Sequence, residues 1–331
     1  MKKRLLACLI CFALLLTGCA SKKPAEKQSR VLFYFDTVVT LSVYTNDKKL
    51  LDDVEKECLR YENLLSKTVE GSDVWNINHA EGKRVPISEE TRGLIMKALE
   101  FSRLSNGKFD ISVEPCVALW DFTGENMGKL PDAKKLEEAA SRVDWTKIDI
   151  NDDGVQIPAD MSIDLGAIAK GYISDKIAQF MAERGVESAL LNFGGNVRTL
   201  GTKPDGSKWR IGIQDPEGAR DQSVIGVVDI EGAAVVTSGI YERGFTVDGV
   251  HYHHILDSDT GWSVQNELAG ISIVTEEACT ADALSTTVFT MGLEEGTAFI
   301  ESLEGVDAIF VTREGKISHT SGLENIFAPV I

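Results

Sequence analysis

The 331-residue sequence is short of positive charge, with 34 Lys and Arg against 51 Asp and Glu and a formal net charge of −17. A protein that binds DNA or RNA through the phosphates needs a basic surface, so we predict no nucleic-acid partner. Its 43% of hydrophobic and 26% of charged residues are typical of a globular protein and exclude a largely disordered chain. An anionic ligand would therefore need local cations or a metal ion.

Cysteine is also scarce, with six residues in all. Two of them fall in an apolar run near the N-terminus and a third follows that run. The other three are widely spaced and form no CxxC pair, which argues against a disulfide framework and a cysteine-rich zinc site. We therefore predict that these three are small buried side chains: Cys58, Cys116 and Cys279.

The apolar run itself, residues 5–16, is shorter than the roughly 20 residues of an ordinary membrane-spanning helix. Lys2, Lys3 and Arg4 precede it and Leu-Thr-Gly-Cys, ending at Cys19, closes it, which is typical of a bacterial export signal and resembles a lipobox. We predict a lipoprotein signal peptide at 1–18, a lipidated Cys19, a flexible polar tether over 19–30 and one folded domain at 31–331. A secreted protein with a chance cysteine is the alternative.

Strand and helix patterns alternate irregularly along the rest of the chain, without internal repeats. This arrangement favours an α+β fold, with mixed or antiparallel sheets and interspersed helices, over regular βαβ winding. We expect strands at 31–44, 161–163, 209–214, 223–230, 233–237, 270–275 and 308–312. We expect helices at 48–65, 88–105, 133–143, 167–184, 280–291 and 294–303.

The first chemically informative segment is DLGAIAKGY at 164–172, between a predicted strand and a predicted helix. Small residues at such a turn let a phosphate approach the N–H groups at a helix N-terminus. Lys170 would add a positive charge, and Asp164 would accept hydrogen bonds from a ligand. The segment is neither a P-loop nor a GxGxxG turn, and an ordinary strand-to-helix turn is the alternative.

A second segment, TADALSTT at 280–287, opens a predicted helix on which Asp282 and Thr286 share one face. A carboxylate and a hydroxyl are hard oxygen ligands that suit Mg²⁺ or Ca²⁺ better than zinc. The alternative is a helix cap, with Thr280 as the capping residue and Asp282 in the first turn.

A third segment gathers three of the five histidines before the turn LDSDTG at 256–261. Strand alternation would put His251 and His253 on one face and His254 on the other, where a cleft-facing imidazole could accept a proton. The turn is not an EF-hand, because its twelfth position is Leu268. Two Gly-containing turns, at 192–196 and 237–239, are weak signals alone, and Ser238 lies in no GxSxG elbow, so we discount a serine hydrolase.

In this order and spacing, these segments resemble the ApbE family of FAD:protein FMN transferases, many of which are exported lipoproteins. The matching stretches are FDT at 35–37, GKFDISV at 107–113, DLGAIAKGY at 164–172, NFGGN at 192–196, TSG at 237–239, HILDSDTG at 254–261 and ADALST at 281–286. The resemblance implies that FAD is split at its pyrophosphate, that FMN is transferred to a Ser or Thr of a partner protein, and that AMP leaves.

The same resemblance implies roles for individual residues. Metal ligands for Mg²⁺ map to Asp282, Thr286, the backbone carbonyl of Ala167 and the neighbouring Ser285. Contacts to the flavin or phosphates of FAD map to Phe35, Thr68, Phe109, Asp110, Ile111, Asp164, Lys170 and Leu256. His254 would activate the incoming hydroxyl and Asp282 would serve catalysis through the metal. The chain departs from the family pattern at Ser258-Asp259, at Ala167 in place of a common Gly, and at Thr68 in place of a frequent aromatic residue.

The expected protein is thus a transferase that modifies exported redox proteins while anchored through Cys19 to the cell membrane, facing outward. Two alternatives use the same residues. One is an Mg²⁺-dependent FAD pyrophosphatase that releases FMN and AMP to water, and the other is a non-catalytic flavin-binding lipoprotein.

Overall fold

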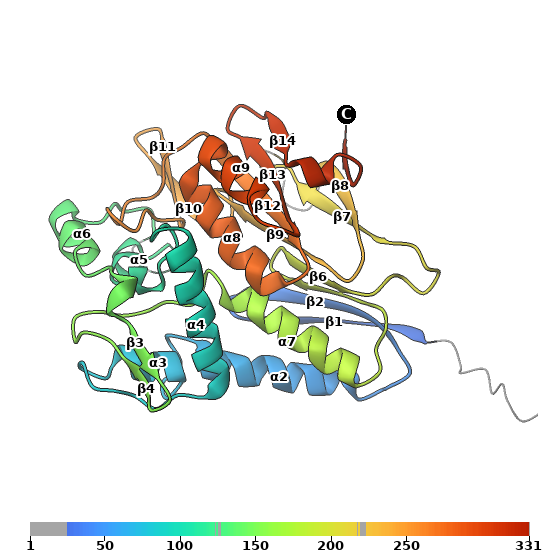
Figure 1. Ribbon diagram of the computed structural model, residues 1–331, viewed down its shortest axis with the longest axis horizontal. Coiled ribbons are helices and arrows are strands. Elements are labelled where there is room, and N and C mark those ends of the chain that lie inside the picture. The colour runs from blue at the N-terminus through green and yellow to red at the C-terminus, as the bar shows by residue number, and fades with distance from the viewer. Residues whose placement is uncertain (1–24, 123, 125–126, 217, 219–222, 331) are drawn as a thin grey trace, which may run out of the picture.

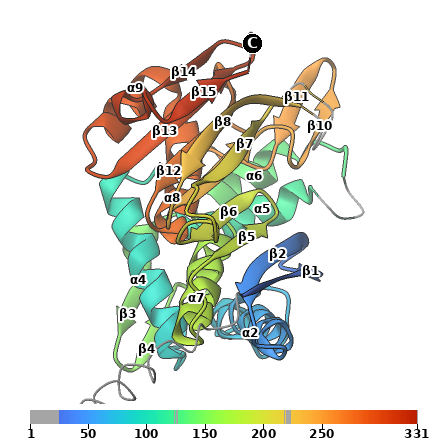
Figure 2. The same ribbon diagram turned by 90° about the vertical axis from the view of Figure 1, so that its right-hand side faces the viewer.

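The computed structural model describes residues 25–122, 124, 127–216, 218 and 223–330. Its centre is a sheet of eight strands in the order β1-β2-β5-β6-β9-β12-β13-β14, with antiparallel pairing throughout (Figure 1). Helices cover one face of this sheet, and a three-stranded sheet, β15-β8-β7, packs on part of the other face (Figure 2). The predicted α+β class with antiparallel sheets is confirmed.

The strands are β1 Glu26–Tyr34, β2 Thr37–Thr45, β3 Asp149–Asn151, β4 Gly154–Gln156, β5 Ala189–Phe193, β6 Asn196–Leu200, β7 Trp209–Gln214, β8 Val224–Ile230, β9 Ala234–Gly239, β10 Gly244–Val247, β11 Val250–His253, β12 Leu268–Thr275, β13 Val306–Thr312, β14 Ile317–His319 and β15 Phe327–Pro329. The helices are α2 Leu50–Leu65, α3 Asp73–Asn78, α4 Glu89–Leu104, α5 Glu114–Trp120, α6 Ala133–Ala140, α7 Ala169–Glu183, α8 Ala278–Met291 and α9 Leu293–Glu301. The predicted helices match these within a few residues.

The predicted single strand at 31–44 is wrong, because the chain forms a hairpin of β1 and β2. Phe35 and Asp36 make the turn with φ of +57° and +54°, a left-handed backbone that residues other than glycine seldom adopt. Strand β1 also starts at Glu26, so the predicted tether ran five residues too far. The early start is stabilised where Arg30 pairs with Asp52 and Glu55 on α2.

The predicted strand at 161–163 is also absent. Its last residue pairs with a side chain instead of a strand: Asn78 donates to the carbonyl of Ile163 at 2.9 Å and accepts from the Ile163 amide at 2.7 Å. The next amide, of Asp164, donates to the carbonyl of Ile111 at 2.8 Å. These bonds hold the start of the 164–172 segment against the core.

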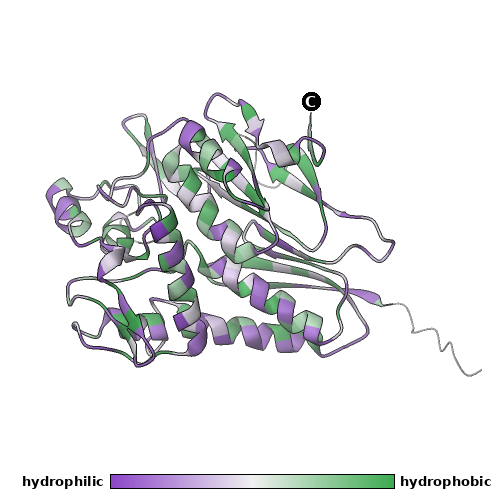
Figure 3. Ribbon diagram, in the orientation of Figure 1, coloured by the Kyte–Doolittle hydropathy of each residue, from purple (hydrophilic) through white to green (hydrophobic). Residues whose placement is uncertain are grey.

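Helix α8 is the most deeply packed helix in the described residues, with ten of its residues buried. Figure 3 shows it as largely hydrophobic, in contrast to the hydrophilic outer side of α2. It lies against α7 at Gly171, where a Cβ would come within 2.2 Å of the carbonyl oxygen of Ala278. Only glycine allows this approach, which brings the starts of the two helices together.

The first turn of α8 is held by a side chain from α7. Asp175 accepts hydrogen bonds from the amides of Ala278 at 3.1 Å and Cys279 at 2.8 Å, and also from Nε of Arg198 on β6 at 2.9 Å. One carboxylate thus joins two helices and a strand, and it places a negative charge at the positive end of α8.

The buried cysteines are confirmed: Cys58, Cys116 and Cys279 are free and buried. Within the described part of the chain, no helix has both the length and the apolar character needed to cross a membrane. The predicted signal peptide and Cys19 lie outside the described residues.

We predict that Asp175→Ala destabilises the fold by about 2–4 kcal/mol, because it removes the cap of α8 and leaves the Arg198 guanidinium without the carboxylate that balances its charge. Urea unfolding monitored by circular dichroism would measure the loss. The matched control is Asp229→Ala, which unpairs Arg210 at the surface and should cost much less. Equal losses in the two variants would contradict the role given to Asp175.

Candidate functional site

The starts of α7 and α8 and the first residue of β6 meet at the carboxylate of Asp282. This side chain is 4% exposed. Its Oδ2 accepts a hydrogen bond from the amide of Gly171 and its Oδ1 accepts one from Nδ2 of Asn196, both at 2.9 Å. The ammonium of Lys170 lies 3.9 Å from Oδ1. Two residues that were predicted in separate segments, Asp282 and Lys170, are therefore brought together.

The alternative in which Thr280 caps α8 is wrong. The helix begins at Ala278 with Glu277 at the N-cap position, and the Thr280 hydroxyl donates to the carboxylate of Glu277 at 3.0 Å. Asp282 consequently lies beyond the first turn, and its carboxylate points toward α7.

Ala167 lies in the turn before α7, one residue ahead of the N-cap Ile168, and it is half-buried. Gly171 is the third residue of α7, and the amides of a first helical turn have no acceptor within the helix. The amide of Gly171 finds its acceptor in Asp282 on α8. The Ala167 carbonyl thus belongs to the turn that leads into this contact.

Two hydroxyls follow on α8. Ser285 is fully buried, donates to the carbonyl of Asp282 at 2.8 Å and lies 2.8 Å from the hydroxyl of Ser238 on β9. Thr286 is half-buried, one helical turn after Asp282. In the described residues no group of three His, Cys, Asp or Glu forms a metal cage. The donor set is one carboxylate, hydroxyls and a carbonyl, and such oxygens fit Mg²⁺ that keeps waters or ligand phosphates.

Asp164 lies in a separate ionic cluster with Lys67 and Glu114. The Lys67 ammonium contacts Oδ2 of Asp164 at 2.8 Å and also pairs with Glu114. The amide of Gly166 donates to Oδ1 of Asp164 at 2.7 Å, which tightens the turn before α7. Burial raises the pKa of Glu114 to about 7, although Lys67 opposes the shift. One lysine thus partly neutralises two carboxyl groups.

His254 follows β11, next to Arg243. Its amide donates to the carbonyl of Arg243 at 3.1 Å, and its Nδ1 lies 3.3 Å from the same oxygen. Burial, with Arg243 and Lys170 nearby, lowers the pKa of His254 to about 4. The imidazole is therefore neutral at neutral pH. A proton on Nδ1 would face the carbonyl and leave Nε2 as the acceptor.

His253 has a packing role instead. It is fully buried, its Nε2 lies 2.8 Å from the carbonyl of Val264, and its ring packs edge-on against Phe289. The ring of His251 lies 6.3 Å from that of His253, as expected for one face of a strand.

The other predicted contacts with FAD are spread around this centre. Phe35 is half-buried at the hairpin turn and its amide donates to Glu62 at 2.8 Å. Asp110 accepts from the amides of Ser112 and Trp145, so its carboxylate holds a turn. Three of the predicted residues, Phe109, Ile111 and Leu256, are buried in apolar clusters, and Thr68 is exposed. The three buried residues could therefore contact a ligand only through their backbone groups, and Thr68 only at the edge of the site.

Four residues that bind predicted site residues, or lie in the same ionic cluster, were not predicted from the sequence: Lys67, Glu114, Asn196 and Ser238. The turn at 192–196 carried a weak signal for Asn196. Lys67 and Glu114 gave none, since they are 97 and 50 residues away from Asp164 in the chain.

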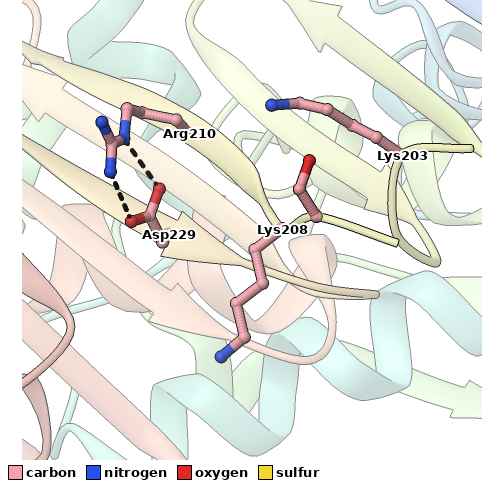
Figure 4. Close-up of a pocket in the computed structure, with 5 residues that line it drawn as sticks. Lys203, Lys208, Arg210 and Asp229 are labelled. Carbon is pink, nitrogen blue, oxygen red and sulfur yellow. Dashed lines mark hydrogen bonds and ion pairs between the residues drawn. The ribbon is translucent and has the colours of Figure 1, made fainter. Parts of the chain in front are cut away.

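A basic hollow on the outer sheet is separate from this centre. It has a volume of about 370 Å³ and is lined by Lys203, Ser207, Lys208, Arg210 and Asp229 (Figure 4). Arg210 donates to both carboxylate oxygens of Asp229 at 3.0 Å, so much of its charge is balanced. None of the predicted site residues lines this hollow.

Comparisons with known proteins agree with the α+β architecture. The ApbE family model matches residues 35–310. The FAD:protein FMN transferase of Klebsiella pneumoniae is 37% identical over 297 residues, covering 88% of this chain and 91% of that protein.

Two solved structures match closely. The ApbE protein of Thermotoga maritima has a TM-score of 0.85 at 32% identity, covering 91% of this chain and 99% of that one. The flavinyl transferase ApbE of Pseudomonas stutzeri, in its apo form, has a TM-score of 0.82 at 28% identity, covering 93% and 99%.

The fold and the relatives define the class: this chain is an enzyme of the flavin transferase type. It belongs to the ApbE family. The prediction of an enzyme is confirmed, and a purely flavin-binding lipoprotein is set aside.

Proposed function

We propose that this protein transfers FMN from FAD to a Ser or Thr hydroxyl of an exported redox protein in an Mg²⁺-dependent reaction, and that AMP is released. The observation that carries the proposal is the cluster at the paired helix starts, where the Asp282 carboxylate lies beside the Lys170 ammonium and accepts a hydrogen bond from the amide of Gly171. Such a cluster can hold a pyrophosphate on an otherwise acidic protein.

Asp282, Thr286 and the Ala167 carbonyl would hold the metal, with Ser285 beside them. When bound, Mg²⁺ supplies charge neutralisation and alignment of the pyrophosphate oxygens. Asn196 and Gly171 hold the Asp282 carboxylate in one orientation before any ligand arrives. Preorganised groups of this kind need no rearrangement at the moment of reaction.

His254 would receive the proton of the acceptor hydroxyl at Nε2. The hydroxyl oxygen forms a new bond to the phosphorus of the FMN half, and the bond from that phosphorus to the bridging oxygen breaks. AMP leaves with that oxygen and its electron pair. Lys170 lies where it can offset the negative charge of the phosphates, since it contacts Asp282 and lowers the pKa of His254.

Hydrolysis of FAD to FMN and AMP would use water in place of the acceptor hydroxyl at the same residues. The names of the relatives favour transfer to protein over hydrolysis. The mass of a co-expressed acceptor separates the two reactions, because only transfer adds FMN to the protein.

We extend the proposal to location: the protein is exported and held at the outer side of the cell membrane through a lipid on Cys19. The short polar segment between Cys19 and β1 supports this, because residues 20–25 would keep the fold within about 25 Å of the lipid. A shift of Cys19→Ser from the membrane to the soluble fraction would support the anchor, and its retention in the membrane would contradict it.

We predict that Asp282→Ala abolishes FMN transfer, because it removes the only carboxylate among the proposed ligands. The acceptor should gain no FMN mass, and calorimetry should detect no Mg²⁺ binding at this site. Asp229→Ala, on the outer sheet, is the control and should keep both properties. Mg²⁺-dependent transfer by a folded Asp282→Ala protein would disprove the metal assignment.

We also predict that His254→Ala slows single-turnover transfer by about 10²–10⁴ while FAD still binds, as expected for loss of a general base. Flavin fluorescence would report binding, and rapid quench with mass analysis would report transfer. His319→Ala, at a histidine on the edge strand β14 that packs against Phe327, should leave the rate unchanged. An unaltered rate in His254→Ala would exclude the role of base.

A further inference from the structure

The outer face of the β1–β2 hairpin carries large apolar side chains in water. Val31 is 68% exposed, Phe33 is 71% exposed and Val38 is 52% exposed. The strand register puts Phe33 directly opposite Val38 and Val31 opposite Thr40, so the three apolar side chains adjoin on one face. We call Val31, Phe33 and Val38 the hairpin patch.

The covering layer of the sheet does not reach this patch. The three-stranded sheet packs over the outer face at Tyr44, Leu190 and Val197 and leaves the turn end of the hairpin open. In Figure 2 the hairpin lies at the margin of the molecule. Strand β1 is also an edge strand, since β2 is the only described strand that pairs with it. The last four residues of β1, 31–34, are apolar or aromatic, and an exposed apolar edge is normally protected against pairing with other chains, so its exposure indicates a binding surface.

The patch is continuous with the candidate site. Phe33 and Val38 lie next to the turn at Phe35 and Asp36, and the carbonyl of Asp36 accepts from Arg243 at 3.4 Å. The carbonyl of Arg243 in turn holds His254.

A second connection runs through the sheet. The carbonyl of Val38 accepts from the amide of Gly194 at 3.0 Å, in the turn that ends at Asn196. Asn196 orients the Asp282 carboxylate. Two chains of hydrogen bonds therefore connect the turn next to the patch with the proposed base and with the proposed metal ligand Asp282.

Charge also singles out this face. Along the outward positions of the hairpin the residues are Lys27, Ser29, Val31 and Phe33 on β1 and Val38, Thr40, Ser42 and Tyr44 on β2. None is acidic, in a protein with a net charge of −17. Other exposed apolar residues, such as Leu59 and Met96, lie on helices, where single exposures are ordinary.

We propose that the hairpin patch docks the acceptor protein: an extended segment with apolar side chains adds to the edge of β1 and leads its Ser or Thr to the site. This inference rests on the proposed function, because a transferase to protein must bring a second polypeptide beside His254. Main-chain pairing at the edge supplies affinity, and Phe33 with its neighbours selects apolar side chains at alternate positions.

The test compares Phe33→Ser with Met96→Ser, which removes an apolar side chain of 57% exposure on α4. The probe is an exported flavoprotein domain that the wild-type protein is first shown by mass spectrometry to flavinylate. We expect Phe33→Ser to raise the KM for this domain at least tenfold. The kcat at saturating acceptor should stay within about twofold, and the Kd for FAD should be unchanged. Met96→Ser should match the wild type in all three.

An unchanged acceptor KM in Phe33→Ser would overturn the docking site. If that variant instead lost binding to anionic phospholipid vesicles, or changed from dimer to monomer in sedimentation, with the acceptor KM unaltered, the patch would serve a membrane or a second copy, and the inference would be wrong. Absence of FMN mass on every acceptor tested with the wild-type protein would refute the proposed function as well, which distinguishes the two failures.

Discussion

Burial of the Asp282 carboxylate at 4% exposure would cost several kcal/mol if its charge were not compensated. Compensation comes from two N–H donors at 2.9 Å and from the Lys170 ammonium at 3.9 Å. This requirement shapes the surroundings: residue 171 must be glycine for α7 and α8 to approach, and β6 must begin at Asn196. The sheet, both helices and the candidate site therefore depend on one ion and its partners.

The balance of charges around Asp282 also explains how an acidic protein can bind an anionic ligand. Most cations near the site are already balanced: Lys67 by Asp164 and Glu114, and Arg198 by Asp175. Lys170 is held less tightly, at 3.9 Å from a carboxylate that also accepts other hydrogen bonds. Its charge is thus the most available one at the helix start, and a metal ion would add to it. The neutral imidazole of His254 can accept a proton, so the site has separate groups for neutralising phosphate charge and for accepting a proton.

Local signals predicted much of the fold from the sequence. Helix α4 begins where Ser88 caps it, as the sequence indicates, and the strand pattern at 209–214 matches β7. The hairpin turn could not be predicted, because Phe35 and Asp36 adopt a left-handed backbone without glycine, held by Glu62 and Arg243 from distant segments. The cluster of Lys67, Glu114 and Asp164 depends in the same way on contacts across the fold, which no local pattern encodes.

The segment at 280–287 shows why two interpretations of one sequence cannot be separated without the three-dimensional structure. A threonine and an aspartate near a helix start fit a cap and a metal site equally well, because both uses need oxygen atoms near backbone N–H groups. Asp175 separates the two interpretations, because this residue, more than 100 positions earlier in the chain, caps α8 from another helix. With the cap supplied from outside, Asp282 is free to face α7. Its carboxylate accepts there from the amide of Gly171, in the first turn of α7, so a contact between residues far apart in the chain holds the carboxylate at the start of that helix.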